Sequence, residues 1–187
     1  MKHIKVSSDK IKERIPELHI GDRVILSGTI YTARDAAHKR IFKLLDNGSN
    51  LPFPLEDSII YYASPTPAPD GLPGTVVGAC GPTTSGRMDP FTPRLLDLGL
   101  PCIIGKGERN QDTVDAIARN HAIYLCAIGG AGALVSKHII SSEEIAFPEL
   151  GCESIKRMKI KNMPLTVAVD MLGKSIFEQG RRRYHRI

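Results

Sequence analysis

The feature that most limits the fold is a regular alternation of short apolar segments with turns and amphipathic segments between residues 23 and 129. Strands that alternate with helices usually form βαβ units, whose neighbouring strands run parallel. We therefore expect an α/β domain. The predicted strands are 23–28, 58–64, 75–80, 101–105 and 123–129, and the predicted helices are 33–46, 90–98 and 111–120.

Local signals set the expected ends of two of these helices. Thr32 is a plausible N-cap for the first, and Asn47-Gly48 is a stop signal at its C-terminus. In the second, Asp89 can cap the helix and Pro90 can occupy its first position.

The ends of the chain do not follow the βαβ alternation. Residues 1–22 are predicted to be an N-terminal arm, and 129–138 a small-residue segment or short helix. The segment 154–171 predicts two strands separated at Asn162–Pro164, so the sheet should not be purely parallel. With four prolines and two glycines, 65–74 predicts a loop. A length of 187 residues fits a single domain over 1–187.

Composition argues against several functional classes. The net charge of +5 is concentrated partly in the basic C-terminal tail, whose role stays open, and the chain has no tryptophan and 5% aromatic residues. Few rings are available to stack on nucleic-acid bases, so we expect no nucleic-acid partner. No apolar run approaches the ~20 residues of a membrane span. The N-terminus lacks the apolar core of a secretory signal, so we expect a cytoplasmic protein.

The spacing of the cysteines does not suggest a metal site. Cys80, Cys102, Cys126 and Cys152 are too widely spaced for a CxxC motif, and we predict no metal ligands in this chain. The first three lie in or beside apolar runs, which is typical of buried reduced thiols.

A polar loop, "GPTTSGR" at residues 81–87, precedes the second predicted helix. Glycine-flanked turns that lead into a helix expose backbone N–H groups to anions, and Arg87 can bind a carboxylate with two parallel hydrogen bonds. The alternative is a capping turn with a surface arginine.

Two further cations follow predicted strands. Lys106 lies between glycines after strand 101–105, where a ligand can approach the backbone closely. Arg34 lies with Asp35 at the start of a helix, where the helix dipole disfavours a cation. Each cation also has an interpretation without a ligand: Lys106 as a lysine in an ordinary βα turn, and Arg34 as an arginine at a helix end. His38 lies one helical turn after Arg34, and it is interpreted either as a partly exposed histidine or as a site residue. The segment "GGAGAL" (129–134) is interpreted as close packing of a helix start against the sheet.

Ligands of α/β sheets bind at the carboxyl ends of the strands, where Arg34, Arg87 and Lys106 are all expected. Three cations with hydroxyl groups between them suit a small dianion such as a dicarboxylate.

Four segments together resemble one family. "YTARDAAHKR", "GACGPTTSGRMDPFTPRLLDLGL", "IIGKG" and "GCESIKRMKIKNMPLTVAVDMLGKSIF" resemble the β subunit of class I, iron–sulfur-dependent fumarases and L-tartrate dehydratases. The same unit is the C-terminal domain of the single-chain forms. The resemblance covers nearly the whole chain and implies a swivelling β/β/α domain, with a mixed sheet flanked by helices.

The resemblance also implies a chemistry. It is the reversible addition of water across the double bond of a C4-dicarboxylate, with a [4Fe–4S] cluster as Lewis acid. The cluster belongs to a partner α subunit, so this chain should be active only with that partner. The implied assembly is a heterotetramer, or a homodimer of this chain.

Carried over by motif, Thr83 is the implied catalytic base, and Arg34, Arg87 and Lys106 are the implied substrate-binding residues. Only the resemblance selects Thr83 over Thr84. Fumarate is the favoured substrate and tartrate the alternative. A non-catalytic dicarboxylate-binding module is the alternative of another class.

Overall fold

The computed structural model describes residues 3–68, 71 and 77–185. In this part of the chain a seven-stranded sheet has the order β1-β2-β3-β4-β5-β7-β6. The strands are β1 (His3–Ser7), β2 (Arg23–Thr32), β3 (Ile59–Tyr61), β4 (Cys102–Gly105), β5 (Ile123–Cys126), β6 (Ile139–Ala146) and β7 (Ile155–Val169).

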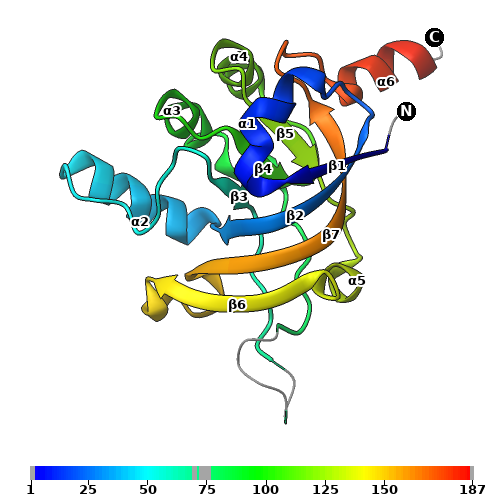
Figure 1. The fold of residues 1–187 in the computed structure, drawn as a ribbon. Coiled ribbons are helices and arrows are strands. Elements are labelled where there is room, and N and C mark those ends of the chain that lie inside the picture. The colour runs from blue at the N-terminus through cyan, green and yellow to red at the C-terminus, as the bar shows by residue number, and fades with distance from the viewer. Residues whose placement is uncertain (1–2, 69–70, 72–76, 186–187) are drawn as a thin grey trace.

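The sheet closes into a barrel. Strands β1 to β5 run parallel to their neighbours, whereas β7 runs antiparallel to both β5 and β2. Strand β7 therefore joins the two edges that the parallel strands leave open, and β6 extends the sheet beyond it (Figure 1). The expected mixed sheet is confirmed, and the closure adds a feature that the sequence did not predict.

Helices cover the outside of the parallel strands. Figure 1 shows α2, α3 and α4 on the same side of the barrel as β3 and β4. Within the described ranges, no helix is long and apolar enough to cross a membrane. The α-helices are α1 (Ile11–Arg14), α2 (Asp35–Asp46), α3 (Thr92–Asp97), α4 (Gln111–Arg119), α5 (Gly132–Ser136) and α6 (Ile176–Tyr184), and the 3₁₀ turns are η1 (Ser8–Lys10), η2 (Ile15–Glu17), η3 (Ser85–Met88) and η4 (Pro148–Glu153).

Two apolar cores lie on opposite faces of the strands. Along β3, Ile59 and Tyr61 belong to the core inside the barrel, whereas Ile60 and the following Tyr62 belong to the core beneath the helices. Strands buried on both faces appear in sequence as continuous apolar runs, which is why they were easy to predict. The predicted arm, 1–22, contributes Ile11 and Leu18 to the inner core.

The predicted start of the first helix was wrong. Helix α2 begins at Asp35 with Arg34 as its N-cap, because Thr32 is still the last residue of β2 and pairs with Tyr61. The Thr32 hydroxyl accepts a hydrogen bond from the Lys156 N–H at 3.0 Å and therefore does not cap the helix. Asn47 and Gly48 end the helix as predicted, with Asn47 as the C-cap.

The second helix also starts later than predicted. The 3₁₀ turn η3 comes first, and α3 begins at Thr92 with Phe91 as its N-cap. Asp89 does not cap α3, because its carboxylate binds the buried guanidinium of Arg109 and the N–H of Asn110 instead.

The predicted strand 75–80 is not formed in its described part. Residues 77–80 have no strand conformation, and 75–76 lie outside the described residues, as does part of the predicted loop 65–74. The N–H groups of Gly78 and Ala79 donate to the carbonyl and the hydroxyl of Thr66, so this segment pairs with a loop and not with the sheet.

The predicted pair of strands around Asn162–Pro164 is one continuous strand, β7. Asn162 has a positive φ of 55° at a shift in the pairing with β2, and its N–H donates to the Ser27 hydroxyl. Asparagine tolerates this backbone conformation, so the irregularity is a bulge and not a turn. Pro164 lies between the stretches that pair with β6 and with β5, so its missing N–H affects at most one side of the strand.

Candidate functional site

The carboxyl ends of β2, β3 and β4 bring the predicted site residues to one edge of the barrel. Arg34 follows β2 and Lys106 follows β4. The polar loop is fixed beside them by two isolated β-bridges, which pair Pro82 with Ala63 after β3 and Thr84 with Lys106. The loop therefore extends the sheet past its last regular residues.

Thr83 and Arg87 form the centre of this edge. The Thr83 N–H donates to the carbonyl of Tyr62 at 2.7 Å, which fixes the threonine backbone. Its hydroxyl accepts a hydrogen bond from Arg87 Nη1 at 3.4 Å, and Arg87 also forms an ion pair with Asp35. Among the described residues, the exposed Thr84 hydroxyl has no hydrogen-bond partner. Thr83 therefore has a guanidinium at its hydroxyl, and Thr84 does not.

Arg34 is held on the other side of the same edge. Its Nη1 donates to the Ser64 hydroxyl at 3.0 Å, and its Nη2 lies 3.3 Å from Glu153 Oε1. The second carboxylate oxygen of Glu153 accepts a hydrogen bond from the Ala36 N–H in the first turn of α2. Glu153 thus supplies the negative charge that a helix N-terminus favours and compensates a cation placed at that end.

Lys106 joins this group through its backbone. Its N–H donates to the Ser85 hydroxyl at 3.0 Å, and its carbonyl accepts from the Ser85 N–H at 2.9 Å. The lysine side chain passes over Gly129, where an added Cβ would lie 3.1 Å from Lys106 Cδ. Its ammonium group has no ion pair among the described residues.

Sequence reasoning missed the partners of the two arginines. The sequence places Asp35 next to Arg34, but it does not predict the ion pair between Asp35 and Arg87. Glu153 and Ser64 are far from Arg34 in the chain and carry no motif. Only the fold brings them together.

His38 is fully buried, so its predicted alternative as a partly exposed histidine was wrong. It packs on Tyr62 and Phe91, and its Nδ1 lies 2.8 Å from the Arg34 carbonyl. That carbonyl can only accept, so the proton is on Nδ1. Burial, with a smaller effect of the nearby Arg109 charge, lowers the pKa of His38 to about 4. His38 is therefore neutral at pH 7, and it donates a hydrogen bond to the carbonyl of Arg34, the N-cap residue of α2.

A buried ion pair lies beneath the polar loop and was not predicted. Arg109 and Asp89 are bonded at 2.6 Å between Nε and Oδ1, with side chains 0% and 8% exposed. The guanidinium also donates to Thr92 at 2.7 Å. In sequence, Arg109 lies within a polar run that resembles an exposed turn, so no local signal marks it as buried.

The four cysteines are unpaired thiols, and they do not form a cluster site. Cys80 and Cys102 are buried as predicted. Cys126, also predicted to be buried, is only partly buried, and Cys152 is exposed. Burial raises the pKa of Cys80 to about 12, which disfavours the thiolate that a metal requires. The residues that the structure describes contain no group of three metal-ligating side chains. This chain's own donors therefore do not fit an iron–sulfur cluster.

The close packing expected for "GGAGAL" is seen at Gly132. A Cβ on Gly132 would lie 3.1 Å from the backbone nitrogen of Gly81 at the start of the polar loop. Helix α5 thus packs against the backbone of this loop.

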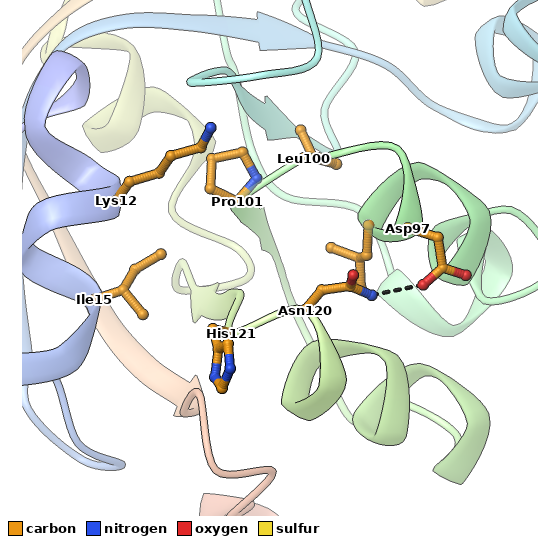
Figure 2. Close-up of a pocket in the computed structure, with 9 residues that line it drawn as sticks. Lys12, Ile15, Asp97, Leu100, Pro101, Asn120 and His121 are labelled. Carbon is orange, nitrogen blue, oxygen red and sulfur yellow. Dashed lines mark hydrogen bonds between the residues drawn. The ribbon is translucent and has the colours of Figure 1, made fainter.

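The pocket of about 350 Å³ in Figure 2 is at the opposite end of the barrel. Pro101 and His121, which line it, precede β4 and β5, and Lys12 comes from α1. Asn120 in its wall donates to Asp97 at 2.6 Å. The pocket contains none of Arg34, Thr83, Arg87 and Lys106. Because ligands of parallel strands bind at the carboxyl ends, we take the edge with these four residues as the candidate site.

Comparison with known proteins gives a consistent result. Residues 1–180 match the family model described as "Fumarase C-terminus". The chain is 35% identical over 178 residues to "Fumarate hydratase 2" of Leishmania major, covering 94% of this chain and 31% of that protein. It is 37% identical over 172 residues to "Fumarate hydratase class I, anaerobic" of Escherichia coli (strain K12), with coverages of 91% and 31%.

A shorter relative matches almost end to end. The chain is 35% identical over 178 residues to the "Putative L(+)-tartrate dehydratase subunit beta" of Methanocaldococcus jannaschii, covering 93% of this chain and 91% of that protein. By contrast, it spans about a third of the length of the two fumarate hydratases.

Proposed function

Because the chain belongs to the fumarase C-terminal family, we propose that it is the β subunit of a dicarboxylate hydro-lyase of the class I fumarate hydratase type. In this proposal it forms the swivelling β/β/α domain of a cytoplasmic enzyme that hydrates fumarate to L-malate reversibly. The observation that carries the proposal is the Arg87 guanidinium, which donates to the Thr83 hydroxyl at the edge where Arg34 also lies.

Thr83 is the proposed base. It takes the proton from the carbon next to a substrate carboxylate when malate is dehydrated, and returns it when fumarate is hydrated. A threonine hydroxyl is a weak base, so it needs neighbours that favour an alkoxide-like oxygen. A hydrogen bond from a guanidinium does this, and Arg87 donates one to Thr83 but none to Thr84.

The cations are the proposed carboxylate clamp. Arg34, Arg87 and Lys106 hold the two carboxylates of the substrate, and they stabilise the negative charge that develops when the proton leaves. Asp35 and Glu153 keep the two arginines oriented before substrate arrives. Substrate carboxylates then share or replace these contacts, so Arg34 and Arg87 are already aligned at the moment of binding.

The Lewis acid of the reaction is proposed to lie on a partner α subunit. The lack of fit between the cysteines of this chain and a [4Fe–4S] cluster supports this proposal. The length of the fumarate hydratase relatives supports it, since about two thirds of each lies outside the match. The proposed assembly is a heterotetramer, or a homodimer of this chain.

Two alternatives would use the same edge of the barrel. The end-to-end match to a tartrate dehydratase relative makes tartrate the alternative substrate. A non-catalytic dicarboxylate-binding module would use the same three cations without Thr83.

The test compares Thr83→Val with Thr84→Val in the complex reconstituted with a candidate α subunit. Valine preserves the shape of threonine and removes the hydroxyl. We expect kcat for fumarate hydration to fall about 10²- to 10⁴-fold in Thr83→Val, the usual contribution of a general base, with fumarate binding kept. Thr84→Val should stay near the wild type.

Full turnover by Thr83→Val would refute its role as base. Turnover by residues 1–187 without any partner would refute the subunit proposal. Dicarboxylate binding without turnover in any complex would favour the binding module, and a higher kcat/KM for L(+)-tartrate than for fumarate would select the alternative substrate.

A further inference from the structure

Both backbone groups of Lys106, its N–H and its carbonyl, form hydrogen bonds with one buried serine, Ser85. The Ser85 N–H donates to the Lys106 carbonyl at 2.9 Å, and the Ser85 hydroxyl accepts from the Lys106 N–H at 3.0 Å. Ser85 is fully buried. The Ser85 hydroxyl therefore adds to the β-bridge between Thr84 and Lys106, and links the Thr83 loop to the end of β4.

Tyr124 of β5 holds the other side of this serine. Its hydroxyl lies 2.8 Å from Ser85 Oγ and 2.9 Å from the Gly107 carbonyl. The Tyr124 hydroxyl is the donor in both bonds and shares its one proton between two acceptors, Ser85 Oγ and the Gly107 carbonyl. Burial raises the pKa of Tyr124, so this proton is kept at every physiological pH. Ser85 Oγ therefore accepts from the Lys106 N–H and from Tyr124, and Tyr124 also binds the Gly107 carbonyl.

The surroundings fix both residues of this chain of bonds. A Cβ on Gly105 would collide with Ser85 Oγ, so the glycine before Lys106 makes room for the serine. The guanidinium of Arg109 lies 5.0 Å from the centre of the Tyr124 ring, and it is itself bonded to Asp89 after the polar loop. Gly105, Lys106 and Gly107 are thus each in contact with the Ser85–Tyr124 pair.

From this geometry we infer that Ser85 and Tyr124 are positioning residues that set the place of Lys106 relative to Thr83. Neither touches substrate in this scheme. Ser85 fixes the Lys106 peptide to the loop that carries the base, and Tyr124 fixes Ser85 and Gly107 to β5. The inference rests on the proposed function only for the role of Lys106 as a carboxylate ligand.

The first experiment is independent of activity. Amide hydrogen exchange is measured at Lys106 in the chain and in Ser85→Ala and Tyr124→Phe. We expect exchange at the Lys106 N–H to speed up about five- to tenfold in Ser85→Ala, the loss of one hydrogen bond, and less in Tyr124→Phe. Matched controls are Ser58→Ala and Tyr61→Phe, which remove buried hydroxyls bonded to the carbonyls of Pro54 and Cys80.

The second experiment measures KM and kcat for fumarate hydration in the reconstituted complex. A displaced carboxylate ligand weakens substrate binding, so KM should rise about five- to tenfold in Ser85→Ala and Tyr124→Phe. A merely structural role would lower the fraction of folded enzyme, and hence the rate per chain, without changing KM. The two control variants should show that pattern.

The inference is overturned if Ser85→Ala leaves both Lys106 exchange and KM at the level of Ser58→Ala, while Thr83→Val abolishes turnover. If Thr83→Val keeps full turnover, the proposed function fails instead. In that case, hydrogen exchange at the Lys106 N–H still shows whether Ser85 restrains the Lys106 backbone.

Discussion

At the scale of single residues, two ion pairs of the same chemical type differ in their surroundings. Arg109–Asp89 is buried, whereas Arg119–Asp97 has side chains 49% and 46% exposed. Removing one partner of a buried pair leaves an unpaired charge without water. Comparing the two pairs therefore tests how much the buried ion pair beneath the polar loop contributes to the stability of the protein.

We expect Asp89→Ala to destabilise the protein by about 3–5 kcal/mol, because it strands the Arg109 guanidinium. Asp97→Ala should leave the midpoint of urea unfolding almost unchanged, since exposed pairs contribute little. Equilibrium unfolding of both variants checks this. Equal losses would show that Arg109 finds another partner or reaches water.

The buried His38 makes stability depend on pH. Its pKa is about 4 in the folded protein and near 6.5 when exposed, so the unfolded chain binds more protons between these values. Stability should be fully present above pH 6.5 and decline as the pH falls toward 4, by on the order of 3 kcal/mol.

His38→Asn tests this dependence. Asparagine can still donate to the Arg34 carbonyl but does not titrate, so the stability of the variant should change less between pH 6.5 and 4. Urea unfolding at several pH values gives the difference between the two proteins, in which the other titrating groups cancel. Parallel pH profiles would mean that His38 reaches a protonated state without unfolding.

Residue identity predicted which side chains share this edge of the barrel, and little of what holds them there; their role as a site stays a prediction. Arg34, Arg87 and Lys106 stand out because they follow apolar strands, whereas Thr83 was selected only by the family resemblance. Glu153, Ser85 and Tyr124 have no such signal, since their roles depend on neighbours that are distant in sequence. Their contacts exist only once the barrel is closed.

At the scale of elements, β7 pairs with three other strands and has a bulge at Asn162, in its pairing with β2. Asn162 takes a positive φ there and is exposed, so its side chain is chosen by the backbone and not by packing. A β-branched residue is strongly disfavoured in this conformation.

Asn162→Val should therefore destabilise the protein by about 1–2 kcal/mol, the cost of a left-handed backbone for an ordinary residue. Lys161→Val, at the neighbouring exposed position, is the control and should have a much smaller effect. Thermal unfolding of both variants measures the difference. Similar behaviour of the two would show that the bulge can shift along the strand.

Element types were easier to predict than element boundaries. Strands β3, β4 and β5 were found because both of their faces are buried, and α2 because apolar positions such as Ala37 and Ile41 recur with helical spacing. The starts of α2 and α3 were wrong because Thr32 and Asp89 bond to distant groups instead of capping. Local capping signals do not reveal such competition.

At the scale of the whole molecule, the barrel joins both ends of the chain. Strand β2, near the N-terminus, pairs with β7 along most of its length, and β7 also binds β5 and β6. The inner core draws residues from all of these strands. No strand of the closed ring can leave without opening this core.

We therefore expect a single cooperative unfolding transition. Far-UV circular dichroism, which follows the backbone, and tyrosine near-UV signals, which follow packing, should give coincident curves in urea. Curves that separate would show that β1, β6 or the helices unfold apart from the ring.

The position of β7 in the chain also affects how the protein is made. During translation at about 5–20 residues per second, β5 emerges from the ribosome several seconds before β7 is complete. Until then the edges of β2 and β5 are unpaired, and such edges promote aggregation. The nascent chain thus passes through an interval in which protection must come from a chaperone or from its own helices, and this interval ends when residue 169 reaches the barrel.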